Sequence, residues 1–197
     1  MCSVHKKRGI NMRSEKIEKA LETKGEERWK LLGQVTEETL KERISQRASP
    51  WRGSPFEAAV PLNKELEGRL IEAFKNTNNY RLRSVFAFLM GEVGGESSIP
   101  VLIEALNSTE KRDFKLVAIE ALGKIGGPQA LKVLRKHASH DPDELIRGTA
   151  VQALQVISSS EHSPVRFGQE AIGDLRNFLK HIENADPSPY VRAMVEG

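Results

Sequence analysis

The stretch "LVAIEALGKIGG", residues 116–127, joins an apolar helical pattern to a pair of glycines. Leu116, Ile119, Leu122 and Ile125 recur every three residues, which predicts the buried face of an α-helix. The glycines suit either a phosphate-binding loop or a bend between two helices, because glycine adopts backbone conformations that other residues avoid. The first interpretation predicts a nucleotide-binding enzyme, and the second predicts a helical repeat protein.

A repeat of 32 residues favours the bend. Related stretches begin at Arg83 ("RSVFAFLMGEVGG"), Lys115 ("KLVAIEALGKIGG") and Arg147 ("RGTAVQALQVISS"). A fixed period of this length is typical of a solenoid, in which helical hairpins stack on one another. The stretch also lacks the lysine and hydroxyl residue that complete a phosphate loop, and no strand precedes it. We therefore interpret the glycines as the bend between the first and the second helix of each unit, with second helices that begin near Pro100 and Pro128.

Two Asp-Pro stretches carry a family resemblance. They are "DPDELIRGTAVQAL", residues 141–154, and "DPSPYVRAMVEG", residues 186–197, and in each an aliphatic-Arg pair follows the Asp-Pro. They resemble HEAT repeats of the short type found in phycobilisome lyases and many bacterial proteins. The resemblance covers about residues 62–197 and implies an all-α fold, an α-α superhelix (HEAT-like solenoid) of about three to four helical-hairpin repeats with an N-terminal helical cap. Such folds host adaptors, lyases, regulatory subunits and nucleic-acid enzymes, so the fold does not determine the function.

The pattern divides the chain into four segments. They are a flexible N-terminus (1–13), an N-terminal cap of two or three short amphipathic helices (14–47), a proline-rich strap (48–61) and the HEAT-like repeat solenoid (62–197). Prolines exclude an uninterrupted helix in the strap. We expect Trp51 and Phe56 to anchor the strap on the solenoid, and the alternative is that they dock a partner.

The composition excludes several classes of protein. The chain has 197 residues, 39% of them hydrophobic and 29% charged, with a net charge of +3, which favours a soluble helical protein. A single cysteine excludes an internal disulfide framework and a thiolate metal cluster. No apolar run is long enough to cross a bilayer, and no secretory signal is seen, so we expect a cytoplasmic protein without membrane insertion.

The second helices are the candidate binding elements, because we expect them to line the concave groove of the solenoid. Their leading leucines (Leu70, Leu102, Leu134 and Leu179) are predicted core residues. The predicted partner-binding residues are Glu72, Glu104, Lys132, Arg135, Lys136, Arg176, Lys180 and His181. The groove thus changes from acidic to basic along the chain, which would orient an extended partner and place its acidic segment or phosphate backbone at the basic end. A solvated polar face is the alternative.

Other polar residues have structural or chemical interpretations that we weigh against each other. The basic column of Arg83, Lys115, Arg147 and Arg192 resembles a phosphate ladder, but the family resemblance implies braces to acids such as Asp141 and Asp186. His137, His140 and Asp141 have a spacing that a metal site at a helix end uses, but no further ligand is evident. We assign no metal, no cofactor and no catalytic residue, since no nucleophile elbow, zinc-protease motif or Cys–His pair is present.

We expect a non-enzymatic protein–protein interaction scaffold or adaptor. One alternative is a nucleic-acid-binding HEAT-like protein that uses the fold as DNA glycosylases of this type do, although Glu72 and Glu104 interrupt its basic stripe. The other is a bilin lyase or chaperone-type HEAT protein. The partner and the oligomeric state stay open at this point.

Overall fold

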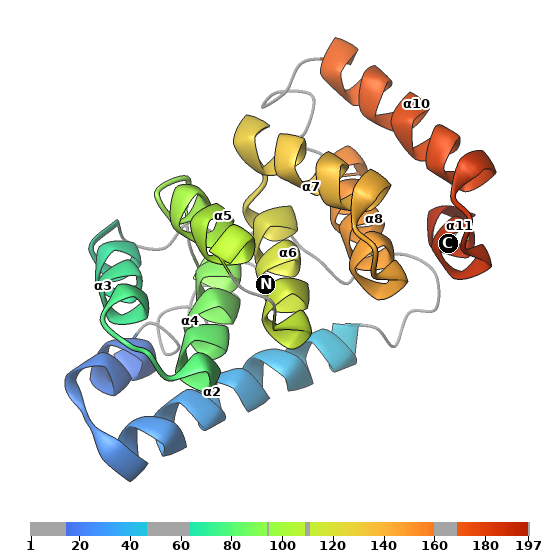
Figure 1. Cartoon of the computed structure of the whole chain (residues 1–197). Helices are drawn as coiled ribbons and strands as arrows, with labels where there is room; N and C mark the ends of the chain where they lie inside the picture. The colour runs from blue at the N-terminus through green and yellow to red at the C-terminus, as the bar shows by residue number, and fades with distance from the viewer. Residues whose placement is uncertain (1–14, 47–63, 94, 109–110, 160–168, 197) are drawn as a thin grey trace, which may run out of the picture.

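The computed structural model describes residues 15–46, 64–93, 95–108, 111–159 and 169–196, and every regular element within these ranges is a helix (Figure 1). After a short helix at residues 15–22, the elements are α2 (Gly25–Gln46), α3 (Lys64–Lys75), α4 (Tyr80–Val93), α5 (Ser98–Ser108), α6 (Arg112–Ile125), α7 (Pro128–His140), α8 (Glu144–Ser159), α10 (Gln169–Ala185) and α11 (Pro189–Glu196). The all-α superhelix predicted from the repeat is confirmed.

The repeat helices form two rows. The first helices (α4, α6, α8 and α11) pack directly on one another along one row, and the second helices (α3, α5, α7 and α10) each pack on the first row. Neighbours within the second row approach one another much less closely. The predicted leucines, Leu70, Leu102, Leu134 and Leu179, are all buried between the two rows, so this part of the core is confirmed.

Small residues explain the close packing of the first row. A Cβ on Gly91 of α4 would lie 2.7 Å from the Cα of Ala121, and one on Gly123 of α6 would lie 2.6 Å from the Cβ of Ala153. Real Cβ atoms do not approach so closely, so the backbones of α4, α6 and α8 come together only because glycine stands at these positions. The next equivalent position holds Gln155, whose Nε2 instead donates to the Val195 carbonyl at 3.1 Å.

The second helices are spaced more widely than the first helices (Figure 1). The eight predicted binding residues lie on this more widely spaced row. Whether the second helices line a concave face stays a prediction.

The glycine pair is a bend, as predicted. Gly126 (φ 72°, ψ −155°) and Gly127 (φ 96°, ψ 158°) combine a positive φ with an extended ψ. This region is almost exclusive to glycine, and it differs from the left-handed helical conformation in which many helices end. Pro128 then begins α7 in its first turn.

The N-terminal helices pack on the repeats. α2 runs unbroken for 22 residues, so the N-terminal segment has two helices in the described range and not three. Thr36 lies within α2, and its hydroxyl donates to the Leu32 carbonyl at 2.8 Å. Leu32 and Val35 are buried in the core cluster that they share with the repeats. Whether residues 14–47 form a separate cap stays a prediction, and Trp51 and Phe56 lie outside the described residues.

Candidate functional site

The predicted cations of the candidate site lie on α7 and α10, in the row of second helices. We call Lys132, Arg135, Lys136, Arg176, Lys180 and His181 the basic surface. All of them are exposed except Arg135, which is partly buried. α7 carries no acidic residue at all. None of the six side chains forms an ion pair with a described residue.

The acidic residues predicted for the same site lie at the other end of the row. Glu72 of α3 and Glu104 of α5 are exposed, and they occupy the repeat positions that Lys136 and His181 occupy later. The exposed residues at this position therefore change from acidic on α3 and α5 to basic on α7 and α10.

Arg135 differs from its neighbours in the basic surface because its guanidinium is turned toward the protein. The guanidinium carbon lies 5.2 Å from the ring centroid of Phe178 on α10. Nε and Nη2 are buried and have no hydrogen-bond partner among the described residues. The equivalent residues of the two preceding second helices are Ile71 and Ile103, which pack against the core. The equivalent residue of α10 is Lys180, which is exposed, so Arg135 is the charged residue at this position whose head group is buried.

His137 and Asp141 contact each other at the end of α7, where a metal site was weighed. His137 Nδ1 lies 3.0 Å from Asp141 Oδ2, and Asp141 Oδ1 accepts from the Asp143 N–H at 3.1 Å. His140 is exposed. Within the described ranges, no group of three or more His, Cys, Asp or Glu side chains is arranged to hold a metal ion. The contact instead links α7 to the turn before α8.

The basic column braces the repeats at Arg147. Its Nε and Nη2 donate to the two carboxylate oxygens of Asp186 at 2.9 and 3.1 Å, and its Nη1 donates to the Asp141 carbonyl at 3.0 Å. Burial disfavours the ionised form of Asp186, but the hydrogen bonds from Arg147 and from the Ser188 N–H outweigh it and hold the pKa of Asp186 below its usual range. Arg83 does not repeat this brace, since it lies over the ring of Phe74 at 4.5 Å.

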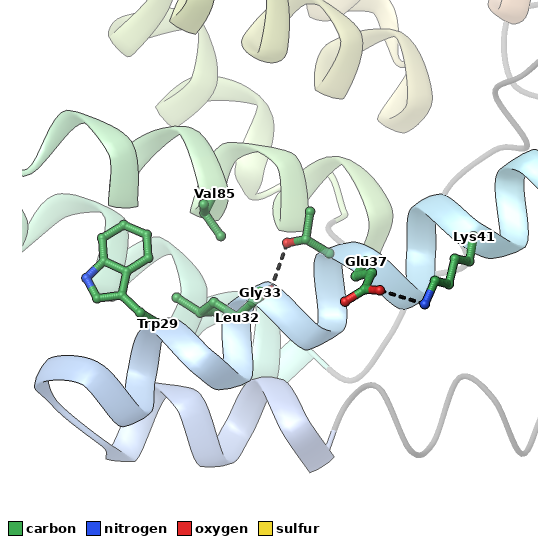
Figure 2. Close-up of a pocket in the computed structure, with 7 residues that line it drawn as sticks. Trp29, Leu32, Gly33, Glu37, Lys41 and Val85 are labelled. Carbon is green, nitrogen blue, oxygen red and sulfur yellow. Dashed lines mark hydrogen bonds and ion pairs between the residues drawn. The ribbon is translucent and has the colours of Figure 1, made fainter.

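An apolar pocket between α2 and α4 had no sequence prediction. It has a volume of about 460 Å³ and is lined by Trp29, Leu32, Gly33, Thr36, Glu37, Lys41 and Val85. Figure 2 shows Val85 of α4 facing Trp29 and Leu32 of α2. Trp29 is 39% exposed. The only sequence signal for this pocket was Trp29 on a helix. A tryptophan on a helix is as common in a core as in a pocket.

Comparisons with known proteins agree with this architecture. Two rows of stacked helical hairpins define an α-solenoid. Residues 68–155 match the family model for HEAT repeats, so this part of the chain consists of HEAT-like repeats. No curated protein and no solved structure matches the chain. None of the helices in the described ranges has the length and apolar character needed to span a membrane.

Proposed function

We propose that this solenoid is a non-enzymatic scaffold that binds an acidic segment of another protein on the basic surface of α7 and α10. The observation that carries the proposal is that none of these cations forms an ion pair with a described residue. α7 has Lys132, Arg135 and Lys136 and no acid, whereas some cations of the first row form ion pairs, as Arg147 does with Asp186 and Lys124 with Glu92 and Glu120. A surface of unpaired cations attracts and orients an oppositely charged partner.

The extent of the surface favours a protein partner over a nucleic acid. The cations of the basic surface lie on α7 and α10, whereas the positions on α3 and α5 that align with Lys136 and His181 hold Glu72 and Glu104. A nucleic-acid groove typically carries a longer basic stripe with exposed aromatic rings for stacking. Phe178, the aromatic residue at this surface, lies under Arg135 and does not present a free face. The role needs shape and charge but no cofactor, and we place it in the cytoplasm.

The test compares two variants with the same change of net charge. The first is the triple variant Lys132→Glu, Lys136→Glu, Lys180→Glu. The matched control is Lys30→Glu, Lys64→Glu, Lys75→Glu, three exposed lysines outside the basic surface. Each purified protein is used to capture partners from the lysate of its native host, with and without nuclease, and the captured proteins are quantified by mass spectrometry.

We expect wild type and the control to retain one protein in stoichiometric amount, and the first variant to lose it, independently of nuclease. Equal capture by both variants would overturn the proposal. Partners that disappear on nuclease treatment would assign the surface to nucleic acid, and a steep dependence of binding on salt would support that assignment.

A further inference from the structure

Arg135 presents a physical problem for the folded protein. A buried guanidinium without hydrogen-bond acceptors is unfavourable, because its N–H groups lose water and gain nothing in exchange. Nε and Nη2 of Arg135 are in this state, and the Phe178 ring offers only its face at 5.2 Å. A cation–π contact attracts the charge but does not provide an acceptor for two N–H groups.

The repeat shows which residues fill this position in the other units. They are Ile71 on α3 and Ile103 on α5, both packed against the core, and Lys180 on α10, which is exposed. Because the buried guanidinium of Arg135 gains no acceptor, we expect it to lower stability relative to the isoleucine that the fold accepts on α3 and α5. A residue that costs stability without a partner in the free protein is expected where a ligand supplies the partner.

We propose that Arg135 is a carboxylate-binding arm, held against Phe178 in the free protein and released to a glutamate or aspartate side chain of the bound partner. The inference rests on the proposed function, and it names the residue that recognises the acidic segment. Nη1 is not among the buried nitrogens, so a carboxylate first meets the guanidinium there. Rotation about the side-chain bonds then exposes the edge formed by Nε and Nη2, which matches the two oxygens of a carboxylate.

The surrounding cations have a different part in binding. Lys132, Lys136 and Lys180 are exposed, so they act as point charges that attract the segment and are screened by salt. Arg135 gains two acceptors for N–H groups that had none. Its replacement should therefore cost more affinity than replacement of an exposed lysine, although both remove one charge.

The test measures affinity and thermal stability for the same variants. The probe is a fluorescein-labelled oligoglutamate peptide, and binding is followed by fluorescence anisotropy at two salt concentrations. The first variant is Arg135→Ile, which introduces the residue that α3 and α5 have at this position. The second is Arg135→Lys, which keeps the charge but not the planar guanidinium. The third, Lys136→Ile, is the matched control that removes one exposed charge.

We expect Arg135→Ile to raise the Tm by about 2–4 °C and to weaken binding by on the order of tenfold or more. Arg135→Lys should also bind more weakly than wild type. Lys136→Ile should lose roughly two- to threefold, with a smaller salt dependence. If Arg135 only stabilises the fold, the Tm of Arg135→Ile should instead be lower than that of wild type.

The outcomes separate this inference from the proposed function. Suppose that the triple lysine variant abolishes binding but Arg135→Ile binds as Lys136→Ile does. The proposed role of Arg135 is then wrong, and the proposed binding at the basic surface is supported. If Arg135→Ile lowers the Tm, the guanidinium stabilises the fold and the arm is wrong. If wild type and the triple lysine variant bind the peptide equally, both the proposed function and the proposed role of Arg135 are contradicted.

Discussion

At the scale of single residues, two glycines determine how closely the first helices approach. Gly91 faces Ala121 and Gly123 faces Ala153 across neighbouring helices, with no space for a Cβ at either glycine. In an isolated helix, glycine is a poor choice because its backbone is too free. Here the missing side chain permits a backbone contact that no other residue allows, so the usual preference is reversed by packing.

A pair of glycine substitutions tests this reversal. Gly123→Ala should lower the free energy of unfolding by about 1–3 kcal/mol, because the new methyl group overlaps Ala153. Gly68→Ala in α3 is the control, since a Cβ there meets no atom within 4 Å. It should instead raise the free energy of unfolding by about 0.5–1 kcal/mol. Urea unfolding measures both, and stabilisation by both variants would contradict the packing explanation.

At the scale of elements, one ion pair joins α8 to the turn between α10 and α11. Arg147 holds both carboxylate oxygens of Asp186, and Arg192 donates to the carbonyl of the same residue at 2.6 Å. Asp186 therefore receives hydrogen bonds from two first helices. It is buried, so removing one partner leaves a charge that water cannot easily reach.

Substitution of Asp186 gives a prediction that depends on pH. Asp186→Asn should lower the free energy of unfolding by about 3–5 kcal/mol at neutral pH, since Arg147 loses its counter-charge. The folded pKa of Asp186 is depressed, so its contribution is complete well above the unfolded pKa of about 3.9 and is lost as the pH falls through the folded pKa. The difference between wild type and variant should therefore shrink below about pH 4.

The control for this variant is Asp143→Asn. Asp143 pairs with Arg112, whose side chain is 50% exposed, and an asparagine keeps the hydrogen bond that Asp143 accepts from the Leu145 N–H. Its loss of stability should stay below about 1 kcal/mol and vary little with pH. Thermal unfolding from neutral to acidic pH measures both variants, and similar losses would contradict the buried brace.

The sequence predicted the elements better than their arrangement. The 32-residue period placed the helices, the bend at Gly126 and the column of buried leucines, because each depends on local pattern. It did not show how closely the first helices pack, since that depends on contacts between Gly123 and Ala153 on different helices. Nor did it show the buried guanidinium of Arg135, since the contact with Phe178 joins residues that are far apart in the chain.

At the scale of the whole molecule, each unit is stabilised mainly by its neighbours. α6 packs between α4 and α8, and α8 packs between α6 and α11. In such a stack, stability is close to a sum of repeat and interface contributions, so units flanked on both sides open least. α11 has a first-row neighbour on one side only within the described part of the chain.

Hydrogen exchange should therefore be graded along the stack. We expect the slowest amide exchange in α6 and α8, and exchange faster by on the order of tenfold or more in α11 and α2. Hydrogen–deuterium exchange with mass spectrometry resolves these helices as separate peptides. Uniform protection from α2 to α11 would show that the chain unfolds as one cooperative unit.

The glycine contacts of the first row also have a mechanical consequence. Helices whose backbones already touch cannot be pushed closer, and separating them loses the whole contact between Gly123 and Ala153. The first row thus has nearly fixed length and acts as a spine. Second helices meet through side chains such as Arg135 and Phe178, which slide and change rotamer. When the solenoid flexes, we therefore expect the second helices to move more relative to one another than the first helices do.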